Sequence, residues 1–176
     1  MTEAGLNQLK YPVGKFTFDP AADVNAFILT IIDFPGKIRH ETEQLTVHQL
    51  DTPYRPDGWT IRQVIHHCAD SHQNAFARFK LALTEDTPVI KPYRENLWAV
   101  QPDYHEPIQP SLLILEGVHH RWAALLNSMN ETDFEQQYMH PEYNRKFTLR
   151  EALGLYDWHC RHHLAHITEL KKREGW

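Results

Sequence analysis

The sequence of 176 residues lacks several features that would assign it to a familiar class of protein. Its two cysteines, Cys68 and Cys160, cannot build a disulfide framework, and both fit helical positions as small buried hydrophobes. The formal net charge is -5, so the basic excess of general nucleic-acid or membrane-surface binders is missing. The N-terminus carries no signal-peptide pattern, and no uncharged apolar run approaches a membrane span. These absences predict a cytoplasmic protein with neither a nucleic-acid nor a membrane partner.

The residues that are present indicate one soluble domain, residues 1–176, with an unusual number of histidines. Hydrophobic residues make up 41% of the chain and charged residues 23%, which is ordinary for a globular protein. The length allows a sizeable core. The chain nevertheless contains 13 histidines, and four of them fall within the stretch YDWHCRHHLAHI, residues 156–167. Histidine is costly to bury without a partner, so this stretch calls for a chemical explanation.

Apolar residues at helical spacing predict four helices and few strands. Thr60 and Ser111 are expected N-caps, and Thr148 with Glu151 forms a capping-box pattern. Pro35 should bend or interrupt the first helix, because proline removes a backbone donor. The chain before residue 18 is expected to be irregular, and NRKFT, residues 144–148, is a weak strand candidate. We therefore predict an all-α four-helix bundle. The helices are expected at about residues 20–43, 60–84, 111–129 and 148–172.

Two of the clustered histidines point toward the predicted core. His159 and His163 fill a gap in the apolar stripe of the last helix, and their i,i+4 spacing puts them on one face. His166 lies at the border of that face, and His162 is expected to be solvated. An inward-facing histidine pair of this spacing is a common way to hold a divalent metal. A single inward histidine, by contrast, is more often a hydrogen-bonded core residue.

A metal site needs at least one further ligand, and the stretch IHHCADSH of the second helix offers three histidines. His72 lies centrally on the apolar stripe, His67 lies on its edge, and His66 points further away. Periodicity leaves His67 and His72 as equal candidates. His119, on the core face of the third helix, is a candidate neighbour of the site.

Several stretches resemble the DinB-like superfamily, and most closely its YfiT-type branch. They are DGWTIRQVIHHCADSHQNAFARFKLALTEDTP, the RW of the third helix, and HPEYNRKFTLREALGLYDWHCRHHLAHITEL. The family signature is a tryptophan at the start of the second helix, a histidine eight residues later and an H-x-x-x-H pair in the last helix. In this chain these residues are Trp59, His67, His159 and His163.

The resemblance has consequences for both the site and the activity. It implies that the metal ligands are His67, His159 and His163, and that His72 is not one of them. It also implies an up-down-down-up bundle, open metal coordination positions, frequent homodimers, and an association with metal-dependent hydrolysis or bacillithiol transfer.

Three neutral nitrogens would leave a metal with an open position, where water or a thiolate can become a nucleophile. We expect Zn²⁺, with Ni²⁺ or Mn²⁺ as alternatives, and no catalytic side chain can be assigned. The expected function is a thiol S-transferase or hydrolase acting on a small electrophilic molecule. The alternatives are a non-catalytic, metal-stabilised binding module and a histidine-rich bundle without a metal.

Either of two loops could cover such a metal and shape a substrate pocket, although local packing at the surface is the more common role of each residue taken singly. One contributes Tyr93, Arg94 and Trp98, and the other contributes Tyr138, Glu142 and Tyr143. On the second helix, Arg62, Arg78 and Lys80 are expected to form a solvated face, and the alternative is that they attract an anionic substrate.

Overall fold

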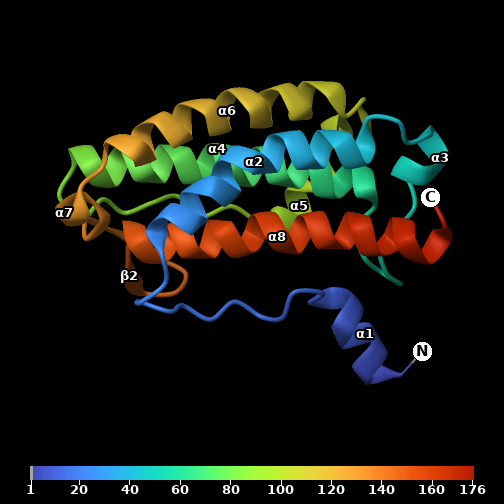
Figure 1. Ribbon diagram of the computed structural model, residues 1–176, viewed down its shortest axis with the longest axis horizontal. Helices are drawn as coiled ribbons and strands as arrows, with labels where there is room; N and C mark the ends of the chain where they lie inside the picture. Colours follow the sequence, from blue (N-terminus) through green and yellow to red (C-terminus); the bar gives the residue numbers. More distant parts are fainter. Residues whose placement is uncertain (1) are drawn as a thin grey trace.

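Four long helices form where the apolar residues recur at helical spacing, which confirms the prediction of an all-α bundle (Figure 1). The computed structural model describes residues 2–176. The long helices are α2 (Val24–Thr42), α4 (Ile61–Thr84), α6 (Gln109–Ser128) and α8 (Leu149–Glu174).

The four helices have the predicted up-down-down-up arrangement. In Figure 1, α2 and α8 run in one direction along the bundle, and α4 and α6 run in the other. Helix α2 packs against α6 and α8, and α4 packs against the same two helices. Side chains of α4 and α8 can therefore meet in the interior of the bundle.

The helix ends follow local hydrogen-bonding rules, with two corrections to the predictions. Thr60 caps α4 as expected and forms a reciprocal capping box with Gln63. Thr148 accepts from the backbone N–H of Glu151, but the Glu151 carboxylate pairs with Arg145 instead of closing the box. Ser111 is not an N-cap, because α6 begins two residues earlier, and its buried hydroxyl contacts the Nδ1 atom of His66 at 2.7 Å.

Proline 35 lies inside α2 without ending it. The helix is continuous from Val24 to Thr42 and changes direction along its length in Figure 1, so the expected bend occurs and the interruption does not. Proline has no N–H, so it cannot donate the usual i→i−4 bond to the carbonyl of Ile31.

Short elements connect and cover the long helices. The antiparallel strands β1 (Gln137–His140) and β2 (Arg145–Thr148) form a hairpin, which confirms the weak strand signal in that segment. The loop after α4 joins this hairpin through bonds on both sides of Met139. The expectation of an irregular N-terminus is wrong for its first turns, which form α1 (Glu3–Lys10) with Thr2 as N-cap. The remaining short helices are α3 (Val47–Leu50), α5 (Glu95–Trp98), η1 (Pro102–His105) and α7 (Glu131–Phe134).

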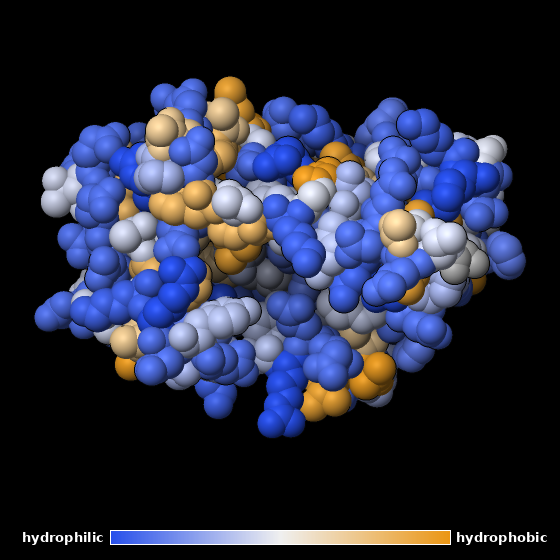
Figure 2. Space-filling view, turned by 90° about the horizontal axis from the view of Figure 1, so that it is seen from below, coloured by the Kyte–Doolittle hydropathy of each residue, from blue (hydrophilic) through white to orange (hydrophobic). Residues whose placement is uncertain are grey.

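Apolar side chains fill the space between the helices. The largest fully buried ones include Trp122, Phe34 and Phe79, and Cys68 and Cys160 are buried free thiols as predicted. Figure 2 shows a mostly hydrophilic face with scattered apolar groups. Among residues 2–176, every helix is too short or too polar to cross a membrane.

The packing predicts that substitutions at two nearby positions of α4 will differ in how far they lower the free energy of unfolding. Phe79→Ala removes a side chain that is 1% exposed, and we expect the free energy of unfolding to fall by about 3–5 kcal/mol. Leu81→Ala, two residues away at a side chain that is 37% exposed, should cost less than about 1 kcal/mol. Urea unfolding followed by circular dichroism measures both. Equal losses in the two variants would contradict the assignment of the core face of α4.

Candidate metal centre

Three histidines from two helices converge inside the bundle. His67 lies on α4, and His159 and His163 lie one turn apart on α8. One ring nitrogen from each lies within 4.8 Å of the others. The Nε2 atoms of His67 and His159 are 3.1 Å apart. The structure therefore brings together the three residues that the resemblance selects. Trp59 packs against His67, with ring centroids 4.6 Å apart.

Burial keeps these imidazoles neutral. Desolvation is the main cause that lowers the pKa of His67 to about 3. Desolvation first, then the neighbouring imidazoles, hold the pKa values of His159 and His163 well below the ordinary value. A neutral imidazole offers one lone pair, which is the form that binds a metal.

The ring nitrogens also fit a metal because some of them have no protein partner. Among residues 2–176, the buried Nδ1 atoms of His67 and His163 have no hydrogen-bond partner. An unpaired buried nitrogen costs free energy. A set of three imidazoles suits zinc and several other transition metals. The donors present therefore fit a divalent transition-metal ion.

His72, the other candidate from periodicity, lies behind His159. Its Nε2 atom is 3.0 Å from His159 Nδ1, and its Nδ1 atom is 2.6 Å from His119 Nε2. His119 in turn contacts the carbonyl of Ile31. His72 also forms a second group of possible ligands with Cys68 and His159. Burial raises the pKa of the Cys68 thiol, so the thiolate that metals bind is disfavoured there.

The prediction that His162 is solvated is wrong. Its ring is buried and stacks on Trp158, with centroids 4.3 Å apart, and Tyr11 lies on another side. The cause is the N-terminal segment, which runs alongside α8 (Figure 1). The Trp158 indole donates to the carbonyl of Gly14, and His166 Nε2 lies 3.2 Å from the carbonyl of Lys10. Helical periodicity cannot reveal a cover that comes from 150 residues away in the sequence.

Three of the clustered histidines form a further group on α8 itself. His162, His163 and His166 each place one ring nitrogen within 4.8 Å of the others. Desolvation lowers the pKa of His162 to about 4 and is the main cause that lowers that of His166 to about 3. His166 stacks on Tyr54 with centroids 3.8 Å apart.

A cavity of about 510 Å³ opens beside the three converging histidines. It is lined by parts of the N-terminal segment, α4, the loop after α4, the hairpin and α8. Tyr93, Tyr138, Glu142 and Tyr143 line it, as expected of the two loops, whereas Arg94 and Trp98 do not. Other lining residues carry no local signal in the sequence and were not predicted, among them Phe16, Glu95, His140 and Arg145.

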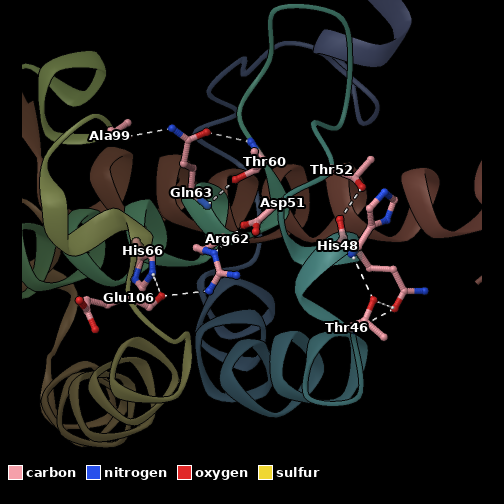
Figure 3. Close-up of polar contacts among 11 residues, drawn as sticks. Thr46, His48, Asp51, Thr52, Thr60, Arg62, Gln63, His66, Ala99 and Glu106 are labelled. Atoms are coloured by element: carbon pink, nitrogen blue, oxygen red, sulfur yellow. Dashed lines mark hydrogen bonds and ion pairs between the residues drawn. The ribbon is translucent and has the colours of Figure 1, made fainter.

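The basic residues of α4 do not all form a solvated face. Arg78 lines the cavity, and its Nε atom is buried without a partner among the described residues. Arg62 is buried and bonds to Asp51 at 2.7 Å and to the carbonyl of Glu106. Figure 3 shows this network, in which His66 also approaches the Glu106 carbonyl. These contacts anchor the loop after α4 to the helix.

Three comparisons relate the chain to known proteins. A model of the DinB superfamily matches residues 35–167. A Bacillus cereus (strain 03BB102) protein named "Putative metal-dependent hydrolase" is 48% identical over 174 residues, covering 97% of this chain and 100% of that protein. A Bacillus anthracis (strain A0248) protein of the same name matches with the same identity and coverage. The structure of YfiT from Bacillus subtilis, described as "a probable metal-dependent hydrolase with an unusual four-helix bundle topology", superposes with a TM-score of 0.92. It is 44% identical and covers 96% of this chain and 99% of its own.

The buried histidines predict sensitivity to acid. Their folded-state pKa values lie below the unfolded value near 6.5, so above that pH the rings are neutral in both states and contribute nothing to the pH dependence. Below it the unfolded chain binds more protons, and stability falls by up to about 1.4 kcal/mol per pH unit for each such ring. Urea unfolding with a chelator present should show a clear loss of stability from pH 7.5 to pH 5.5.

Two variants identify the groups responsible for this loss. His166→Gln should make the decline with pH shallower, because it removes a buried ring whose pKa is about 3. His120→Gln, at an exposed position on α6, should leave the slope unchanged. A wild-type protein that is equally stable at both pH values would show that the buried rings do not control acid unfolding.

Proposed function

The chain belongs to the DinB superfamily, and on that premise we propose that it is a metal-dependent enzyme whose divalent cation is held by His67, His159 and His163. The observation that carries the proposal is the convergence of three neutral imidazoles from two helices beside a cavity. Three protein ligands leave a position open for substrate, as in catalytic sites, whereas structural zinc sites use four.

The donor set favours Zn²⁺, with Ni²⁺ or Mn²⁺ as alternatives, because imidazole binds several transition metals. When bound, the ion would supply Lewis acidity that lets water or a thiol react near neutral pH. The three histidines hold the ion equally well for both nucleophiles. The proposed activity is therefore hydrolysis, or transfer of a low-molecular-weight thiol of the bacillithiol type to a small electrophile.

The lining of the cavity supports a small polar substrate. Its volume of about 510 Å³ lies in the range of small-molecule sites. Burial raises the pKa values of Tyr93 and Tyr138, so these phenols stay protonated and can donate hydrogen bonds. Arg78, with an unpaired buried Nε–H, is placed to bind an anionic or carbonyl group of the substrate.

The role of the ligands can be tested at His67. We expect His67→Ala to weaken metal binding by more than about 100-fold, beyond the range typical of residues that only support ligands, and to abolish turnover. Elemental analysis of untagged protein reports the metal. Thiol transfer is measured as the loss of free low-molecular-weight thiol in the presence of a haloalkane acceptor. Hydrolysis is measured with a panel of esters. His120→Ala, at an exposed histidine, should leave all three measurements unchanged.

Three outcomes would overturn the proposal. Untagged wild-type protein without stoichiometric metal, or a His67→Ala protein with full activity, would remove the metal from the mechanism. A protein that unfolds on chelation, yet turns over no substrate in either assay, would be a metal-stabilised binding module instead.

A further inference from the structure

A line of polar contacts begins at the proline inside α2. Because Pro35 has no N–H, the carbonyl of Ile31 lacks the donor that an uninterrupted α-helix would provide. Ile31 is fully buried, so water cannot readily replace that donor. The Nδ1 atom of His119, on α6, lies 2.6 Å from this oxygen. The imidazole thus supplies the hydrogen bond that the proline withholds.

The contacts continue from His119 to the candidate metal centre. His119 Nε2 lies 2.6 Å from His72 Nδ1, and His72 Nε2 lies 3.0 Å from His159 Nδ1. The line touches every long helix, running from α2 through α6 and α4 to α8. Phe34 packs against His72 and His119, with ring centroids 5.2 and 5.6 Å apart. This aromatic packing helps to shield His72 and His119 from solvent.

The Ile31 carbonyl at one end of this line of imidazoles fixes the direction of its hydrogen bonds. A carbonyl oxygen only accepts, so His119 Nδ1 must carry the proton. His72 and His119 are fully buried among apolar side chains, where a charged ring would lack solvation, so each ring in the line is neutral and carries one N–H.

It follows that His119 Nε2 accepts from His72 Nδ1–H. His72 Nε2 then accepts from His159 Nδ1–H, and His159 Nε2 keeps a bare lone pair. The opposite order would set the Nδ1 lone pair of His119 against the Ile31 carbonyl at 2.6 Å.

We propose that Pro35, His119 and His72 form a positioning relay that holds His159 as the Nδ1-protonated tautomer, with its Nε2 lone pair directed toward His67. The proposal rests on the proposed function where it treats His159 as a metal ligand; the order of the protons does not depend on the metal. Such outer partners fix the orientation of a ligand and raise its basicity. Here the outermost partner is the Ile31 carbonyl, which lacks a backbone donor and acts on His159 through the rings of His119 and His72.

The tautomers can be observed directly in the wild-type protein. Two-bond ¹H–¹⁵N correlation spectra of full-length protein with labelled histidine, recorded with and without Zn²⁺, distinguish the two nitrogens of each ring. We expect a proton on Nδ1 of His119, His72 and His159 in both states. A proton on His159 Nε2 in the zinc-free state, or a doubly protonated ring in the relay at neutral pH, would overturn the proposal.

A backbone variant separates this role from a merely structural one. Pro35→Ala restores the N–H that competes for the Ile31 carbonyl and leaves every histidine in place. A merely structural role predicts a stabler α2 and unchanged zinc affinity. The relay predicts that zinc affinity, measured by competition with a chromophoric chelator, falls by about tenfold, at the lower end of what outer partners contribute.

A second variant tests the rings themselves. His119→Phe keeps a similar shape and removes both nitrogens, and we expect zinc affinity to fall by about 10–100-fold. His120→Phe, at the exposed neighbouring position, is its matched control and should bind zinc like the wild type. Wild-type affinity in folded Pro35→Ala and His119→Phe proteins would overturn the proposal. Failure of the relay and failure of the proposed function give different results. Zinc-loaded protein without turnover would refute the proposed enzyme, but it would leave the predicted tautomers of His119, His72 and His159 unchanged.

Discussion

The structure depends on keeping neutral imidazole rings inside an otherwise apolar bundle. Each ring removed from water carries one donor and one acceptor, and either costs free energy if it is left alone. The protein meets this constraint in two ways. His72 and His119 obtain partners from each other, from His159 and from the Ile31 carbonyl. His67, His159 and His163 bring one ring nitrogen each within 4.8 Å of the others beside the cavity, where the proposed metal ion would bind. Most of the free energy of folding still comes from the aliphatic and aromatic side chains around them.

This arrangement divides the work between helices and loops. Helices α4 and α8 carry the converging histidines on rigid, packed scaffolds, which is what precise geometry requires. The hairpin and the loop after α4 are joined through the backbone of Met139 and supply most of the tyrosines around the cavity. Arg62, His66 and Ser111 hold the far end of that loop in place. Loops supported in this manner can present polar groups without disturbing the helices below them.

The sequence predicts the parts of this design that are local. Apolar periodicity locates the four long helices, and the i,i+4 spacing of His159 and His163 places both on the inner face of α8. Periodicity could not choose between His67 and His72, because both lie near the inner stripe of α4; only the resemblance separated them. The burial of His162 and the use of the Ile31 carbonyl by His119 could not be predicted, because each depends on a segment distant in the sequence. Pro35 predicts a bend in α2, but it does not predict which side chain will bond to the Ile31 carbonyl that it leaves without a donor.

The N-terminal segment is anchored to α8 by the carbonyls of Lys10 and Gly14, and Phe16 forms part of the cavity wall. None of these residues belongs to the four packed helices. A change in residues 10–16 would therefore reshape the cavity wall and leave the packing of the four helices, with the three converging histidines, in place. The shape of the cavity and the placement of the buried imidazoles are thus set by separate parts of the polypeptide.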